Sequence, residues 1–175
     1  NIWFGTSGGG ISKLDNERFI HFRQNEKLGK WVYAIQHDQK GNTWFGTSSG
    51  GVTLYDGEEY KLLKGYHGFT PVKVRAIFAD KDSTVWFGTT AKGLYSYKDK
   101  VFRKYNRSNG LKNNFIVSFT KDTSGNLWFS SLDHGIGYYN PETEKFFNFN
   151  KKDGIGSNRV YSILCDSLGN LWACT

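Results

Sequence analysis

The chain has 175 residues, a formal net charge of +7 and an aromatic content of 17%. Its 21 glycines and 2 prolines are too few for collagen-like or low-complexity sequence, and no apolar run approaches the ~18–20 residues of a membrane span. Lysines and arginines are scattered through the chain, so we interpret the positive charge as solvated strand faces and loop tips, with no nucleic-acid partner. The sequence contains no methionine and enters patterned sequence at once, which leads us to expect a fragment of a longer protein.

An internal repeat organises the whole chain. Five tryptophans recur at intervals of 41, 42, 42 and 44 residues, at positions Trp3, Trp44, Trp86, Trp128 and Trp172. An aspartate lies six residues before each of the last four, and a glycine lies seven residues after each of the first four. This register predicts one domain over 1–175, with repeats at about 1–30, 31–72, 73–114 and 115–157 and a partial repeat at 158–175.

In chain order, each complete repeat holds four short runs rich in β-branched and aromatic residues, which are typical of strands. In the second repeat these runs lie at 31–36, 42–47, 51–56 and 59–64. The chain begins in the second run of one repeat and ends in the second run of another. No segment shows the roughly 3.6-residue apolar period of a helix. The pattern therefore predicts an all-β chain of about four four-stranded β-propeller blades.

A four-stranded sheet cannot bury both of its faces alone, so blades stack face to face around an axis. We expect an open partial arc of a larger, seven-bladed propeller, with incomplete first and last blades. The alternative is a closed four-bladed ring, in which the runs at 161–166 and 170–175 would complete the first blade beside 10–15.

The Asp-x-x-Gly element before most of the repeated tryptophans predicts a tight turn between the first two strands of a blade, although Ser83 replaces the glycine in one repeat. If the aspartate pairs with the residue after the glycine, Trp44 shares a face with the small residues Ala34 and Gly46. A large indole beside small residues predicts a knob for the neighbouring blade, so we expect the tryptophans in the core.

The same register makes a prediction for the two cysteines. It pairs Cys174 with Ser162 and Cys165 with Leu171, so the cysteine side chains point to opposite faces of the hairpin. We therefore expect two free thiols, with Cys174 as a small core residue.

A family resemblance rests on the segments 38–56, 122–131 and 166–175, which read DQKGNTWFGTSSGGVTLYD, DTSGNLWFSS and DSLGNLWACT. The segments 110–119 and 154–163 add GLKNNFIVSF and GIGSNRVYSI. Over essentially its whole length the chain resembles the two-component regulator propeller repeats of bacterial sensor proteins.

That resemblance implies a periplasmic, ligand-sensing region of a membrane-anchored hybrid two-component sensor histidine kinase. The better understood members of the family sense oligosaccharides, so the implied ligand is an oligosaccharide or another small periplasmic molecule. The implied protein partners are the remaining blades of the parent protein and a second copy of that parent. A protein–protein docking or dimerisation platform is the alternative function.

The residues give little support to enzymatic chemistry. His21, His37, His67 and His134 occupy four different repeat positions, and neither H-x-x-x-H nor C-x-x-C spacing occurs. We expect no catalytic residues, no metal and no cofactor. A propeller lyase or glycosidase, with its site assembled from scattered loops, is a further alternative.

The loops that follow the outermost strand of each blade vary between repeats while their flanks keep register, so we expect ligand binding there. Aromatic platforms beside amide, guanidinium and imidazole donors suit a sugar ring and its hydroxyls. The candidate residues are Trp31, Tyr66, His67, Arg75, Arg107, Asn114, Arg159 and Tyr161. Other residues of these loops and the strand starts beside them are Phe69, Lys73, Asn109, Asn113 and Asn158. For Asn114 and Asn158 a turn role is favoured, because Gly-x-x-x-Asn recurs.

Overall fold

The computed structural model describes residues 2–22, 29–48, 51–63, 65, 69–70 and 72–175. These residues form strands and two short 3-10 helices, so the chain is all-β as predicted. Within these ranges no helix is long and apolar enough to cross a membrane.

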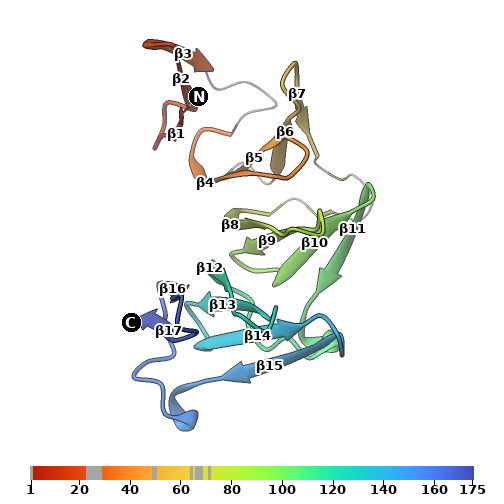
Figure 1. The fold of residues 1–175 in the computed structure, drawn as a ribbon, viewed down its shortest axis with the longest axis vertical. Helices are drawn as coiled ribbons and strands as arrows, with labels where there is room; N and C mark the ends of the chain where they lie inside the picture. The colour runs from red at the N-terminus through yellow and green to blue at the C-terminus, as the bar shows by residue number, and fades with distance from the viewer. Residues whose placement is uncertain (1, 23–28, 49–50, 64, 66–68, 71) are drawn as a thin grey trace. The chain divides into compact units, whose positions relative to one another are not determined.

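The strands fall into sheets whose members follow one another in the chain (Figure 1). The first sheet contains β1 (Ile2–Gly5), β2 (Ile11–Asp15) and β3 (Arg18–Phe22). The second contains β4 (Val32–His37), β5 (Thr43–Thr47), β6 (Val52–Tyr55) and β7 (Tyr60–Leu62). The third contains β8 (Val74–Ala79), β9 (Val85–Thr89), β10 (Leu94–Lys98) and β11 (Val101–Tyr105). The fourth contains β12 (Ile116–Lys121), β13 (Leu127–Ser131), β14 (Ile136–Asn140) and β15 (Lys145–Phe149).

The last two strands, β16 (Ser162–Cys165) and β17 (Leu171–Cys174), form a two-stranded sheet of their own. They do not join β1–β3 among the described residues, so the pairing required by a closed four-bladed ring is not formed. Three sheets have the four consecutive strands of a propeller blade, and the first and last sheets have fewer. This confirms the predicted fold class.

The predicted hairpin register is confirmed in the second and last sheets. Ala34 lies opposite Gly46, and the Asp38 N–H donates to the Asn42 carbonyl at 3.0 Å. Ser162 lies opposite Cys174 and Cys165 opposite Leu171, and both thiols are free. The prediction that Cys174 is a core residue is wrong, because its side of β17 is exposed in the described part of the chain.

The turn before the tryptophan is held by a set of hydrogen bonds that we call the Asp–Asn–Trp clamp. In the second sheet, Asp38 Oδ1 accepts the N–H of Asn42, and Oδ2 accepts the side-chain amide of Asn42 and the indole Nε1–H of Trp44 at 2.8 Å. The same clamp recurs at Asp122, Asn126 and Trp128 and at Asp166, Asn170 and Trp172. In these three sheets, the constant spacing of six residues between aspartate and tryptophan thus corresponds to a direct hydrogen bond between the two side chains.

The turn of the third sheet has Ser83 and Thr84 where the clamp turns have glycine and asparagine. Ser83 takes the turn glycine's place with φ of 67°, in the left-handed region that favours glycine. The carboxylate of Asp82 accepts from the N–H and hydroxyl of Thr84 and pairs with Lys98 at 2.7 Å.

The clamp predicts a loss of stability in acid. Burial raises the pKa of Asp38 and Asp122, but the hydrogen bonds from Asn and Trp side chains and from backbone N–H groups outweigh it and lower the pKa of both. The bond from Trp172 is the largest cause that lowers the pKa of Asp166, to about 2. These groups therefore stabilise the fold above about pH 4, the pKa of an unfolded aspartate, and that contribution is lost as pH falls through their folded pKa values. We expect the urea midpoint to be steady near neutrality and to fall between about pH 4 and pH 2.

The matched variant is Asp122→Asn, whose side chain cannot titrate. It should be less stable than the parent at neutral pH and should show a shallower fall in urea midpoint on acidification. An unchanged pH slope in this variant would mean that other groups cause the acid loss.

The described residues form two compact units. Unit 1 is Asn1–Phe87 with Tyr95–Arg103, and unit 2 is Gly88–Leu94 with Lys104–Thr175. Within unit 1, a Cβ added to Gly46 would lie 2.9 Å from both Val74 Cγ1 and the Val74 carbonyl oxygen. Within unit 2, a Cβ on Gly88 would lie 2.8 Å from Ile116 Cγ2. The glycine two residues after the tryptophan therefore gives room for the β-branched residue that opens the next sheet.

The tryptophans differ in burial. Trp44 is 2% exposed and packs its ring on Phe87 and Tyr97, with centroids 5.5 and 5.2 Å apart, and Trp86 is also buried. Trp3 and Trp128 are half-buried. Trp172 is 62% exposed, so for this residue the predicted core position is wrong. Burial at this position thus depends on whether another sheet lies against it.

Candidate functional site

Trp31 lies at the start of the second sheet, immediately before β4. Its backbone N–H donates to Ser48 Oγ at 3.3 Å, and its carbonyl accepts from the Ser48 N–H at 2.9 Å. These bonds fix the strand start to the loop that follows β5. The indole is 46% exposed, so an aromatic ring is held in place with much of its surface in solvent.

A β-bulge at Tyr33 brings two of the predicted site residues together. Val32 lies opposite Thr47 and Ala34 opposite Gly46, so Tyr33 is the extra residue between them. Bulges re-aim side chains next to binding sites. The Tyr33 ring lies edge-on to Trp31, with centroids 6.4 Å apart, and the Arg75 guanidinium carbon lies 4.5 Å from the Tyr33 centroid. We call Trp31, Tyr33 and Arg75 the aromatic–arginine cluster.

Tyr33 was not among the predicted site residues. The repeat register contains the signal that could have identified it, because Tyr33, Arg75 and Tyr161 all lie eleven residues before their tryptophan. Arg75 and Tyr161 were predicted as residues of the innermost strands near the variable loops, whereas the residue that connects Trp31 with Arg75 was missed.

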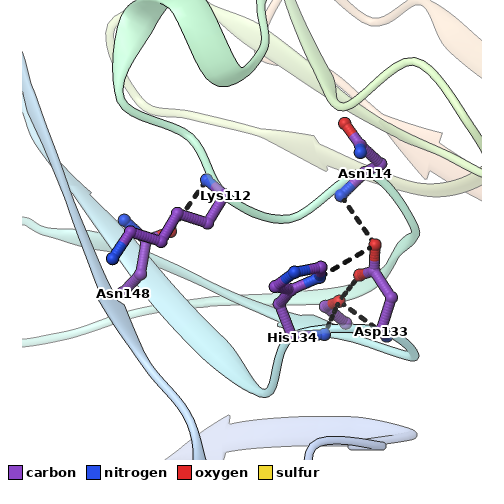
Figure 2. A network of polar contacts seen from close by, with 6 residues as sticks. Lys112, Asn114, Asp133, His134 and Asn148 are labelled. Atoms are coloured by element: carbon purple, nitrogen blue, oxygen red, sulfur yellow. Dashed lines mark hydrogen bonds and ion pairs between the residues drawn. The ribbon is translucent and has the colours of Figure 1, made fainter.

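Unit 2 contains a polar network around Asp133, in the loop after β13 (Figure 2). The carboxylate accepts the Asn114 N–H at 3.2 Å and the Ser131 hydroxyl, and its Oδ2 lies 3.2 Å from His134 Nδ1. The Ser131 oxygen accepts the backbone N–H groups of Asp133 and His134. The loop before β12 is held by a side chain of β15, because the Asn148 side-chain oxygen accepts the Lys112 N–H at 3.2 Å.

The network keeps Asp133 ionised. Burial raises the pKa of its carboxyl, but bonds from the Ser131 hydroxyl, the Asn114 N–H and His134 outweigh burial and hold the pKa below its usual range. The Ser131 hydroxyl donates to this carboxylate, so its proton is not held by an imidazole as nucleophilic catalysis would require. Across the ranges that the structure describes, no group of three or more histidine, cysteine or acidic side chains could hold a metal. The arrangement is a fixed set of hydrogen-bonding groups.

Asn114 and Asn158 both make contacts with distant backbone groups. The Asn114 carbonyl accepts from Gly93 N–H at 3.2 Å, and the Asn158 carbonyl accepts from Gly135 N–H at 2.8 Å. The Asn158 side chain also accepts from the Lys151 N–H at 2.7 Å. Asn114 therefore joins the end of its repeat to a loop of the same repeat, and Asn158 joins the start of the last repeat to loops of the preceding one.

The remaining candidates are distributed as follows. Arg107 is exposed in the 3-10 helix η2 (Arg107–Asn109), and Arg159 is also exposed. Tyr161 is 55% exposed, with its N–H bonded to the Cys174 carbonyl at 2.8 Å. Tyr66 and His67 lie outside the described residues.

Two other residues of the variable loops, Phe69 and Asn113, are buried. Phe69 is a core residue that packs on Tyr95 and Phe102, with centroids 4.9 and 4.8 Å apart. Asn113 has no exposed surface. The other loop residue of this group, Asn109, accepts from the Asn106 N–H and completes the cap of η2.

Comparison with known proteins shows that the chain is similar to β-propellers. A family model described as Two component regulator propeller matches more than half of the chain, in the segments 27–49, 68–91, 110–133 and 154–175. No curated protein matches the sequence.

Solved structures extend the comparison. The extracellular domain of the hybrid two component system BT3049 from B. thetaiotaomicron is 30% identical with a TM-score of 0.84, over 99% of this chain and 24% of that one. The corresponding domain of BT4673 from the same organism is 22% identical with a TM-score of 0.77, over 98% of this chain and 26% of that one. An inactive virginiamycin B lyase from Staphylococcus aureus, solved with quinupristin, is 17% identical with a TM-score of 0.74, over 95% of this chain and 56% of that one. The chain thus spans about a quarter of the length of the two sensor domains.

Proposed function

This chain belongs to the two component regulator propeller family, and from that membership we propose that it is part of the ligand-sensing, periplasmic region of a hybrid two-component sensor histidine kinase. Its similarity to the extracellular domain of BT3049 supports the proposal. The proposed ligand is an oligosaccharide, and the proposed role is recognition without chemistry. The resemblance to virginiamycin B lyase, at 17% identity, indicates a shared fold only.

The aromatic–arginine cluster is the observation that carries the oligosaccharide proposal. A sugar ring presents an apolar C–H face that stacks on an aromatic ring, and hydroxyls that accept from a guanidinium. Trp31 offers a half-exposed indole, and Arg75 offers a guanidinium held against Tyr33. Because the bulge and the Ser48 bonds fix these groups in advance, little side-chain freedom is lost on binding.

In unit 2, the network around Asp133 supplies a second set of groups suited to hydroxyls. The carboxylate is an ionised acceptor, and the His134 side chain is 41% exposed beside it. Arg159 and Tyr161 add an exposed guanidinium and phenol to the same unit.

A docking platform is the second candidate function, and one observation favours it. Leu164, Leu168 and Trp172 in the last hairpin are all more than half exposed. Exposed apolar residues gathered on one element are typical of surfaces that another protein covers. The proposed occupants are the remaining blades of the parent protein or a second copy of it.

The test is a glycan array on the 175-residue chain, followed by titration calorimetry of any glycan that binds. Trp31→Ala and Arg75→Gln should each weaken binding about tenfold, the effect of losing one stacking or charge-assisted contact. Phe19→Ala, which removes an exposed aromatic ring elsewhere in unit 1, is the matched control and should bind as the parent does. Glycan binding that survives both cluster variants, or an array with no binding glycan, would overturn the proposal.

A further inference from the structure

A pocket of about 420 Å³ lies in unit 1, beyond the end of β4 that is opposite to Trp31. It is formed by the β4–β5 turn, the β8–β9 turn and the β10–β11 turn, with the strands that enter them. The lining residues at the mouth are Asp38, Lys40, Asn42, Ser83, Asp99 and Lys100. The volume falls within the range of small-molecule sites, about 300–1,000 Å³.

The floor of this turn-end pocket is apolar. It is made by Trp44, Leu54, Val85 and Tyr97. Trp44 and Val85 are buried, and the Trp44 and Tyr97 rings meet edge to face with centroids 5.2 Å apart. Trp44 is 2% exposed and its indole Nε1–H donates to Asp38, so the apolar surface open to a ligand comes from Leu54 and Tyr97, which are half-buried. Such a floor favours a flat apolar ring over a polyhydroxylated one.

The charged side chains at the mouth differ in how many hydrogen bonds and ion pairs they already form within the protein. The Asp38 carboxylate accepts four hydrogen bonds within its own turn, which leaves it little capacity to bind a cation or a donor. Lys40 and Lys100 are exposed and form no ion pair with any described residue, whereas Lys61 and Lys98 each pair with an aspartate. Asp99 is the remaining carboxylate of the lining, so the formal charges of Lys40 and Lys100 are balanced by Asp38 and Asp99, and the two ammonium groups are the charged donors left for a ligand.

From these observations we propose that the turn-end pocket binds an aromatic monocarboxylate. The ring lies against Tyr97 and Leu54, and the carboxylate accepts from the Lys40 and Lys100 ammonium groups. A metal cation does not fit, because Asp99 would be its single unengaged carboxylate. The site is separate from the aromatic–arginine cluster, so either proposal can fail without the other.

The experiment is a titration of the ¹⁵N-labelled chain with benzoate, benzamide and glucuronate, followed by two-dimensional NMR. Benzoate should shift the Trp44 indole Nε1–H signal and the amides of Ser83 and Lys100. Benzamide has the ring without the charge, and glucuronate has the charge without the aromatic ring. Each should bind at least about fivefold more weakly than benzoate, since each lacks one of the two contacts.

Lysine variants test the charge contact. Lys40→Gln and Lys100→Gln should each weaken benzoate binding about three- to tenfold, because each removes one partly exposed charge-assisted contact. Lys81→Gln is the matched control, an exposed lysine of the β8–β9 turn outside the lining, and should bind as the parent does. Trp31→Ala should also leave benzoate binding unchanged.

Three results would overturn the proposal: no shift of the Trp44 indole signal at millimolar benzoate, equal binding of benzamide and benzoate, or tighter binding of glucuronate. If Lys40→Gln and Lys100→Gln both bind benzoate as tightly as the parent does, the lysines do not bind the carboxylate and the proposal is overturned as well. Because all the lysine substitutions are at exposed positions, the variants should fold, and a thermal melt of each one checks this.

Discussion

Replacing Trp44 by alanine should lower the free energy of unfolding by about 3–5 kcal/mol, as the truncation of a large core aromatic does. The indole is 2% exposed and packs on Phe87 and Tyr97 of the neighbouring sheet. The substitution leaves a cavity between two sheets, and it also removes the donor that Asp38 holds at 2.8 Å. Urea unfolding of parent and variant, followed by circular dichroism, measures the difference.

Trp172→Ala is the matched control because it separates packing from hydrogen bonding. Trp172 makes the same bond, at 2.9 Å to Asp166, but its ring is 62% exposed. Its loss should lower the free energy of unfolding by about 1 kcal/mol or less. Similar losses in the two variants would show that the clamp bond, and not packing between sheets, dominates the tryptophan's contribution.

Gly46→Ala should be the second large effect, a destabilisation of about 1–3 kcal/mol from overpacking. The added methyl group would lie 2.9 Å from Val74 Cγ1 and 2.9 Å from the Val74 carbonyl oxygen. The valine side chain can yield by rotation, but the carbonyl belongs to β8 and can move only with that strand. A lower melting temperature and a lower urea midpoint are the expected measurements.

Two further variants test whether the contact with Val74 causes this destabilisation. Gly156→Ala adds the same methyl group where the nearest atom, Thr175 Oγ1, is 4.0 Å away, and should be close to neutral. Val74→Ala combined with Gly46→Ala should recover little, because the backbone contact remains. Full recovery in the double variant would mean that the side chain alone sets the spacing between the two sheets.

The strands and the first hairpin of each blade could be predicted from the sequence because a local pattern repeats. Asp38, Asn42 and Trp44 contact one another across one turn, so their spacing is constant and visible in the chain. Whether Trp172 is buried or exposed could not be predicted in this way. Its exposure depends on what covers its face of the sheet, which no spacing within the hairpin determines.

The candidate site was less predictable for two physical reasons. The bulge at Tyr33 is a shift in pairing between two strands, and β-branched and aromatic composition does not distinguish a bulged residue from its neighbours. Asp133 contacts Asn114 across nineteen positions, between a loop of one repeat and the last residue of the repeat before it, where the copies differ. Phe69 is an aromatic residue of a variable loop that is buried in the core, which its place in a loop does not indicate.

The Asp–Asn–Trp clamp has a consequence for how such chains change length in evolution. Each clamp satisfies the polar edge of its tryptophan within its own hairpin, so the ring presents only carbon to whatever sheet follows. The sheet that follows needs only a β-branched residue at its first position, as at Val32, Val74 and Ile116. No side-chain hydrogen bond of the clamp has to be matched between neighbours. A duplicated or deleted repeat therefore brings its own clamp with it, and the number of blades can vary by whole units without any clamp bond having to be remade between neighbours.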